Sequence, residues 1–252
     1  MRKLLLCACF FCLLADAGAQ VKQTQQAEQI WLGYFNQTRL SNKWGMWADA
    51  HLRTRDEFAN KFSVSILRFG LTYFIDDNTR LTAGYGYVSH YPNGKQKITQ
   101  PEHRPWQQIQ WQTSYRKKKM VQALRLEERF RRKLLNDSAL ADGNNFNFKL
   151  RYNFLYELPL SSKGVAPGTF SFLVNDELHI NFGKEIVNNY FDQNRLFLGF
   201  KYQLNKTNAV QLGYQHVFQQ LAAGNSYRTI NGVRVFYLQN FDWRKKKPEP
   251  AA

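Results

Sequence analysis

Hydrophobic and polar residues alternate along most of this chain, over residues 29–243, in segments of ten to fourteen residues separated by turn residues. In the clearest segment, 146–156, aromatic or aliphatic residues occupy every even position and polar residues most of the odd ones. A period of two residues predicts a β-strand whose two faces differ in chemistry. These segments are longer than an average strand and match the roughly 9–11 residues with which a tilted strand crosses a bilayer. The pattern therefore predicts a transmembrane β-barrel.

Eleven such segments are recognisable, joined alternately by short turns and by long loops at 92–103, 133–145, 182–194 and 220–231. Short periplasmic turns and long external loops are typical of outer-membrane barrels, which in bacteria have an even number of strands. We therefore expect an all-β, antiparallel transmembrane barrel of about 12 strands, with 10 as the alternative. A further strand would lie in a loop, for example at 185–191. The segments are 29–40, 43–55, 62–75, 79–91, 104–116, 119–132, 146–158, 169–181, 195–204, 208–219 and 232–243.

A soluble barrel with apolar residues inside would produce the same period of two. Three features favour the membrane form, in which the apolar face points to lipid. The strands are long, they number more than eight, and the polar face carries many charges. A wide barrel with an apolar interior would enclose an empty apolar cavity, so we expect the polar face to line the lumen.

Residues 1–19 have the features of a cleaved secretion signal. Two basic residues precede an apolar stretch at 4–15, and Ala17-Gly18-Ala19 fits the cleavage pattern. Twelve apolar residues are too few for a membrane-spanning anchor. All three cysteines lie in this segment, so the exported chain would have no disulfides. We expect residues 20–252 to form a single outer-membrane barrel domain that ends in a basic tail at 244–252.

The net charge is +16, and it remains +15 when the two basic residues and one acidic residue of the signal are removed. In an exported barrel this excess favours anionic lipid headgroups and small anionic solutes as partners. No recognition-helix pattern supports nucleic-acid binding. The densest charged run is 125–131. With the apolar face in lipid, we expect a lumen charge network of Asp49, His51, Arg53, Arg55, Arg68, Arg125, Glu127, Arg129, Arg131, Lys149, Arg151, Glu177, His179 and Lys201.

Two interpretations of this network stay open. It is either an ion-pair network that fills a narrow barrel, or a basic constriction that selects anions. The first is favoured, because so few strands enclose little more than side chains and buried charges must be paired. Two acidic residues, Glu128 and Asp176, share the outward parity, and each would need a β-bulge or an interfacial position.

Catalytic and metal-binding patterns are weak. The enzymatic alternative is an outer-membrane lipid hydrolase of the phospholipase kind, with serine, histidine and asparagine on the outer wall. His216 has the outward parity, but no outward serine accompanies it in a convincing pattern. A metal site at His51, Glu177 and His179 rests on a spacing that is common by chance. We therefore expect a structural or narrow-pore barrel without a cofactor or metal, rather than an enzyme.

Seven short motifs, taken in order, resemble the domain of unknown function 2490 family, over nearly all of the chain after residue 20. They are Trp31-Leu32-Gly33-Tyr34, Lys43-Trp44-Gly45-Met46-Trp47, Arg68-Phe69-Gly70-Leu71, Gly84-Tyr85-Gly86-Tyr87, Arg104-Pro105-Trp106-Gln107-Gln108, Arg125-Leu126-Glu127-Glu128-Arg129-Phe130 and Phe191-Asp192-Gln193-Asn194-Arg195-Leu196. The resemblance implies a Gram-negative outer-membrane barrel and carries no assigned activity or catalytic residues. It also implies outer-membrane lipids and the barrel-insertion machinery as partners, although that machinery usually reads a terminal aromatic and here residues 244–252 follow Trp243.

Overall fold

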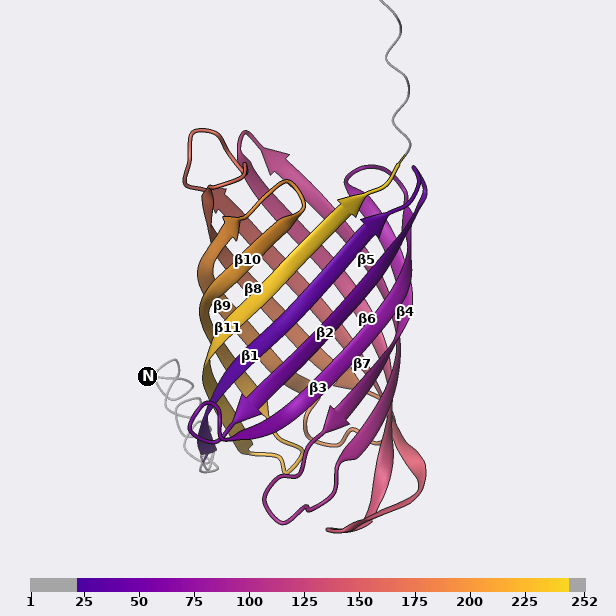
Figure 1. Cartoon of the computed structure of the whole chain (residues 1–252). Coiled ribbons are helices and arrows are strands. Elements are labelled where there is room, and N and C mark those ends of the chain that lie inside the picture. The colour runs from indigo at the N-terminus through magenta and orange to yellow at the C-terminus, as the bar shows by residue number, and fades with distance from the viewer. Residues whose placement is uncertain (1–21, 245–252) are drawn as a thin grey trace, which may run out of the picture.

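Eleven strands form one closed sheet in the computed structural model, which describes residues 22–244 (Figure 1). The predicted signal at 1–19 and nearly all of the predicted tail at 244–252 lie outside the described residues. Among those residues, no helix is long and apolar enough to cross a membrane. The strands are β1 (Gln23–Arg39), β2 (Trp44–Arg55), β3 (Lys61–Phe74), β4 (Thr79–His90), β5 (Gln100–Tyr115), β6 (Lys118–Asn136), β7 (Ala139–Pro159), β8 (Phe170–Phe182), β9 (Phe191–Gln203), β10 (Asn208–Gln220) and β11 (Ser226–Asp242).

The barrel closes through a parallel pairing of its first and last strands. Strands adjacent in sequence pair antiparallel, whereas β1 and β11 pair parallel, from Gln23 opposite Ser226 to Arg39 opposite Asp242. With an odd number of strands the first and last run in the same direction, so only a parallel closure is possible. The predicted all-β barrel is confirmed, and its eleven strands lie between the expected 10 and 12. The closure differs from the expected antiparallel one.

The region proposed for a further strand, 185–191, is mostly loop. Residues 183–190 connect β8 to β9, and only Phe191 belongs to a strand. The backbone N–H of Asn181 donates to the carbonyl oxygen of Tyr190 at 2.8 Å, which joins the two ends of this loop. Gly183 has a φ of +129°, a conformation that interrupts the strand where β8 ends.

The predicted long loop at 133–145 is wrong, because these residues continue β6 and β7. Those two strands, of 19 and 21 residues, are joined by a turn at 137–138 and extend beyond the other strands at the bottom of Figure 1. We call this side of the barrel the loop end, where the connections 56–60, 91–99, 183–190 and 221–225 also lie. The connections 40–43, 75–78, 116–117, 160–169 and 204–207 lie at the opposite side, the turn end. β1 therefore begins at the loop end, and β11 finishes at the turn end (Figure 1).

The outer face of the barrel is apolar and the inner face is polar. On β3, the outward side chains of Leu67 and Phe69 are 61% and 64% exposed, whereas Arg68 between them is 7% exposed. The buried apolar cluster is small and comprises Trp31, Val217, Ile230 and Phe236. A soluble barrel would have the opposite arrangement, so the alternative with apolar residues inside is not what the structure shows.

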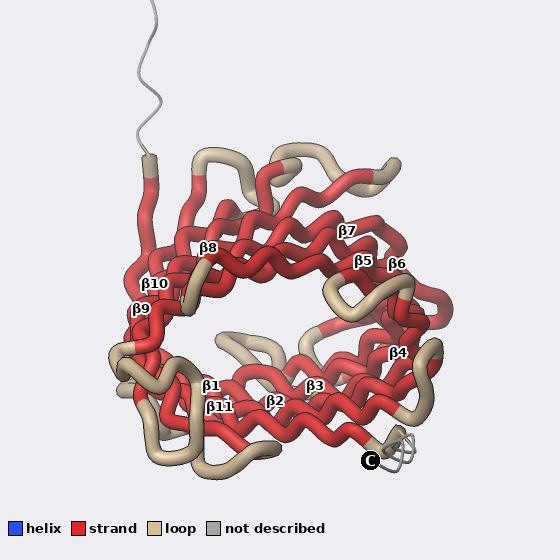
Figure 2. The backbone as a smooth tube through the Cα atoms, turned by 90° about the horizontal axis from the view of Figure 1, so that it is seen from above, coloured by secondary structure: helices blue, strands red, loops and turns tan. Residues whose placement is uncertain are grey.

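Two pairs of glycines face each other across neighbouring strands, and an inward aromatic ring covers each pair. They are Gly70 opposite Gly84 under Trp106, and Gly199 opposite Gly213 under Phe197. Glycine allows a strand to bend sharply and another group to approach its backbone. Seen along its axis the barrel is flattened, with β4 and β9 toward opposite ends of the oval (Figure 2). The glycine pairs thus lie where the sheet curves most.

Candidate functional site: a charged cavity inside the barrel

An elongated cavity of about 800 Å³ runs through the barrel, and all eleven strands contribute to its lining. The lining extends from Tyr91 and Leu221 at the loop end to Gln37 and Asn240 near the turn end. Within residues 22–244 the lining includes twelve arginines and one lysine but three carboxylates, those of Glu127, Glu177 and Asp192. The space that remains inside the barrel is therefore surrounded by an excess of positive charge.

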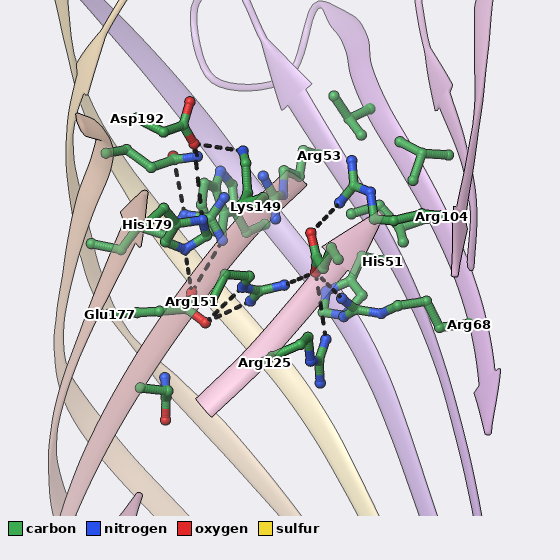
Figure 3. Close-up of a pocket in the computed structure, with 18 of the residues that line it drawn as sticks. His51, Arg53, Arg68, Arg104, Arg125, Lys149, Arg151, Glu177, His179 and Asp192 are labelled. Carbon is green, nitrogen blue, oxygen red and sulfur yellow. Dashed lines mark hydrogen bonds and ion pairs between the residues drawn. The ribbon is translucent and has the colours of Figure 1, made fainter. Parts of the chain in front are cut away.

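Glu127 on β6 is the centre of the largest ion-pair cluster. Its side chain is completely buried and lies within ion-pair distance of arginines on β3, β5, β6 and β7 (Figure 3). The distances from its carboxylate are 2.6 Å to Arg151, 3.2 Å to Arg104, 3.8 Å to Arg68 and 3.9 Å to Arg125. One carboxylate thus compensates part of the charge of four guanidinium groups from four strands.

Glu102 on β5 is a second such centre, which the sequence analysis missed. Its buried carboxylate lies 2.5 Å from Arg104, 2.8 Å from Arg129, 2.9 Å from Arg131 and 2.9 Å from His90. The predicted strand began at residue 104, so Glu102 was assigned to a loop. The sequence does contain a signal for the inward position of Glu102. Polar or charged residues at 100, 102 and 104 alternate with Pro101 and His103.

Three further carboxylates extend the network around the wall, two of which, Glu177 and Asp192, are labelled in Figure 3. Glu177 contacts Arg151 at 2.6 Å, His179 at 2.9 Å and Arg195 at 3.3 Å. Asp192, which the sequence analysis assigned to a loop, contacts Lys149 at 2.6 Å. Asp49 contacts Arg68 at 2.8 Å and His51 at 2.9 Å. Because Arg68 and Arg151 also reach Glu127, these contacts link strands β2, β3 and β5 to β9.

Twelve of the fourteen residues of the expected network line the cavity. The other two are buried in ion pairs, Asp49 with Arg68 and Lys201 with Glu157. Lys201 and Glu157 lie near the turn end, away from the rest. Arg53 and Arg55 have no carboxylate within ion-pair distance among the described residues; Arg55 donates to Asn93 and to the carbonyl oxygen of Pro92. The charged residues of the inner face outside the expected network include Glu102, Arg104, Asp192, Arg195 and Arg234, and also Arg80 and Arg228.

Several arginines of the lining stack on aromatic rings. The guanidinium carbon of Arg53 lies 3.8 Å from the centre of the Trp31 ring, and that of Arg125 lies 4.4 Å from Trp106. Arg234 of β11 lies 3.3 Å above Phe197. A ring face attracts a cation, and the planar guanidinium keeps its edge free for hydrogen bonding.

The two outward acidic residues, Asp176 and Glu128, accept hydrogen bonds from polar side chains on neighbouring strands. Asn194 donates to Asp176 at 2.8 Å, and Gln107 donates to Glu128 at 3.4 Å. The strand register is regular at both positions, so of the two expected explanations, a β-bulge or an interfacial position, the β-bulge does not apply. A neighbouring carboxamide offers each carboxylate a hydrogen bond without a break in the ladder.

His216 on the outer wall is paired with an asparagine and a tyrosine. His216 lies 3.1 Å from the side-chain oxygen of Asn231 and 3.3 Å from the hydroxyl of Tyr214. A tyrosine therefore stands where the expected arrangement needs a serine. Over residues 22–244, no three His, Cys, Asp or Glu side chains are placed to hold a metal ion. His51 is paired with Asp49 on β2, whereas Glu177 and His179 are paired on β8.

Comparison with known proteins gives a family for this barrel. Neither the curated proteins nor the solved structures contain a match. One family model matches residues 28–228, which extend from β1 into the start of β11. The match covers most of the chain and confirms the resemblance that the seven motifs indicated. The chain therefore belongs to the family described as protein of unknown function (DUF2490).

Proposed function

We propose that this protein is an outer-membrane β-barrel whose narrow lumen admits small anions. The observation that carries the proposal is the cavity that reaches toward both ends of the barrel with thirteen cationic side chains and three carboxylates in its lining. Rings of cationic side chains lower the barrier for anions and raise it for cations. The ion pairs fill part of the lumen, but about 800 Å³ remains, which favours a pore over a filled barrel.

The membrane location is supported by two groups of outward aromatic pairs on either side of an aliphatic zone. Aromatic residues are enriched at the two interfaces of a membrane, where the ring is apolar and the edge meets water. Near the loop end the pairs are Phe130–Phe146, Phe148–Phe182 and Phe218–Tyr227, and near the turn end Trp44–Tyr73, Phe170–Tyr202 and Phe241–Trp243. Between them lie exposed aliphatic side chains such as Leu67, Leu124 and Leu198.

The full chain is expected in the outer-membrane fraction of a Gram-negative cell. After boiling, the protein should migrate differently on a denaturing gel, because folded barrels resist detergent and unfold only on heating. A chain without residues 1–19 is the matched control and should remain in the cytoplasm. Recovery of the full chain as a folded, soluble periplasmic protein without detergent would rule out the membrane location.

The reconstituted barrel is expected to conduct chloride better than potassium. In a planar bilayer with a potassium chloride gradient, the reversal potential should have the sign of anion selectivity, because cations dominate the lining. The double variant Arg53→Glu/Arg234→Glu should move that potential toward cation selectivity. Arg116→Glu is the control, since Arg116 lies in the turn between β5 and β6. A cation-selective potential for the native chain would contradict the proposal, and absence of current would indicate a filled barrel.

A further inference from the structure

Three buried arginines of the lumen lack a close carboxylate among the described residues, although Arg125 donates to Gln108 at 2.8 Å and Arg234 donates to the carboxamide oxygens of Asn175, Gln211 and Gln215. Arg53 and Arg234 have no carboxylate within ion-pair distance, and Arg125 reaches only Glu127, at 3.9 Å. Each has a buried nitrogen without any hydrogen-bond partner: Nε of Arg53, Nε of Arg234 and Nη1 of Arg125. A buried donor without an acceptor is unfavourable, and a buried charge without a counter-charge is more so. These nitrogens therefore point to an anionic group that completes the site.

Arg53 and Arg195 both contact the indole ring of Trp31. Their guanidinium carbons lie 3.8 Å and 5.0 Å from the centre of the Trp31 ring. Arg53 has no ion pair among the described residues, whereas Arg195 lies 3.3 Å from Glu177. The π face of Trp31 attracts both cations but supplies no hydrogen-bond acceptor for their edges. A carboxylate can accept from both guanidinium groups and relieve their repulsion.

The wall next to this pair carries no carboxylate. Among the cavity-lining residues of β10, β11 and β1, there is no aspartate or glutamate; the three carboxylates of the lining lie on β6, β8 and β9. Arg234 projects from this wall and stacks on Phe197, which follows Arg195 by two residues on β9. An anion between Arg53, Arg195 and Arg234 therefore meets three cations, and the lining of the adjacent wall has no carboxylate to repel it.

The remainder of the lining suits hydroxyl groups. It contains eleven glutamines and nine asparagines, and every carboxamide can both donate to and accept from a hydroxyl. Among them, Nε2 of Gln37 and Oδ1 of Asn181 are buried without a partner. A cavity of about 800 Å³ lies within the usual range of small-molecule sites and holds one or two sugar rings with water.

We propose that the lumen contains a binding site for an acidic sugar. Arg53, Arg195 and Arg234 bind the carboxylate, and the glutamine and asparagine side chains along the cavity bind the hydroxyls. This inference rests on the proposed function, since the sugar must enter the lumen. Such a binding site would make the pore selective for solutes that are larger than chloride and carry both a negative charge and hydroxyl groups.

The test is a comparison of D-glucuronate, D-glucose and acetate on the full chain folded in detergent, measured by titration calorimetry. Glucuronate and glucose differ at one position, where a carboxylate replaces a hydroxymethyl group. We expect glucuronate to bind about tenfold more tightly than glucose or acetate. Only glucuronate has both a carboxylate for the arginines and hydroxyl groups for the glutamine and asparagine side chains. The variant Arg53→Gln/Arg234→Gln should lose at least about tenfold in glucuronate affinity. Arg228→Gln, which removes one lining cation near the loop end, should keep the native affinity.

Folding of the double variant is checked by its heat-dependent gel migration. If that variant does not fold, the native chain still decides the question, because glucuronate should reduce its chloride current and equal concentrations of glucose should not. Equal affinity for glucuronate and glucose overturns the carboxylate site, and equal affinity for glucuronate and acetate overturns the sugar class. Chloride current without glucuronate binding overturns this inference and leaves the pore intact. Glucuronate binding without current supports the site and contradicts the pore.

Discussion

Replacing Glu127 by glutamine is expected to destabilise the barrel by about 3–5 kcal/mol, the usual cost of removing one partner from a buried ion pair. The carboxylate is completely buried and compensates Arg68, Arg104, Arg125 and Arg151. Glutamine keeps the size of the side chain but removes its charge, so four cations from four strands would repel one another. The free energy of unfolding is measured by urea titration of the protein in lipid vesicles, followed by tryptophan fluorescence.

Glu128→Gln is the matched control for this prediction. Glu128 is the next residue of the same strand, has the same side chain and points outward, where it accepts from Gln107 at 3.4 Å. Removal of its charge from the outer face should leave the stability unchanged or raise it, because in the proposed membrane location a charge facing lipid is unfavourable. Equal losses of unfolding free energy for the two variants would show that the charge of Glu127 does not stabilise the barrel.

Arg129→Gln should have a smaller effect than Glu127→Gln. Arg129 contacts Glu102 at 2.8 Å, and that carboxylate keeps Arg104, Arg131 and His90 when Arg129 is removed. The lumen has more cations than carboxylates, so the loss of a cation leaves no carboxylate unpaired, whereas the loss of a carboxylate leaves cations uncompensated.

The period of two was sufficient to find all eleven strands, because each has a lipid-like apolar face and a polar face over most of its length. It failed in two segments that form strands through pairing alone, one at the start of β1 and one where β6 meets β7. The first residues of β1, 23–28, are nearly all polar and show no alternation, yet they pair with residues 226–231 of β11. Similarly, residues 133–145 lack a clear apolar face and form strands because β6 and β7 pair with each other.

The candidate site was predictable only in part for a related reason. Parity along a strand indicates which side chains point inward, and this placed Glu127 and Arg151 in the lumen. It does not indicate their height relative to residues on other strands, which depends on strand tilt and register around the whole barrel. Glu102 and Asp192 were missed because their strands begin earlier than the pattern suggested. The proximity of Arg53 to Arg195 follows from the parallel closure between β1 and β11, for which the sequence has no local signal.

Replacing Gly84 or Gly213 by alanine is expected to destabilise the barrel by at least about 1–3 kcal/mol, the usual cost of overpacking. A Cβ atom on Gly84 would lie 2.1 Å from the carbonyl oxygen of Phe69, and one on Gly213 would lie 2.3 Å from that of Leu198. Both contacts are with backbone, so a rotation of a side chain cannot relieve them and the neighbouring strand must move. Urea unfolding in vesicles measures the loss.

Ala83→Val is the control for these glycine variants. It adds two methyl groups to the neighbouring residue of β4, but on the exposed outer face, and should leave the stability almost unchanged. Because the two glycine pairs lie on opposite sides of the flattened barrel (Figure 2), the losses in Gly84→Ala/Gly213→Ala should be additive. Gly84→Ala with native stability would show that the sheet has room to bend there without glycine, and that the close approach under Trp106 does not determine the flattened shape.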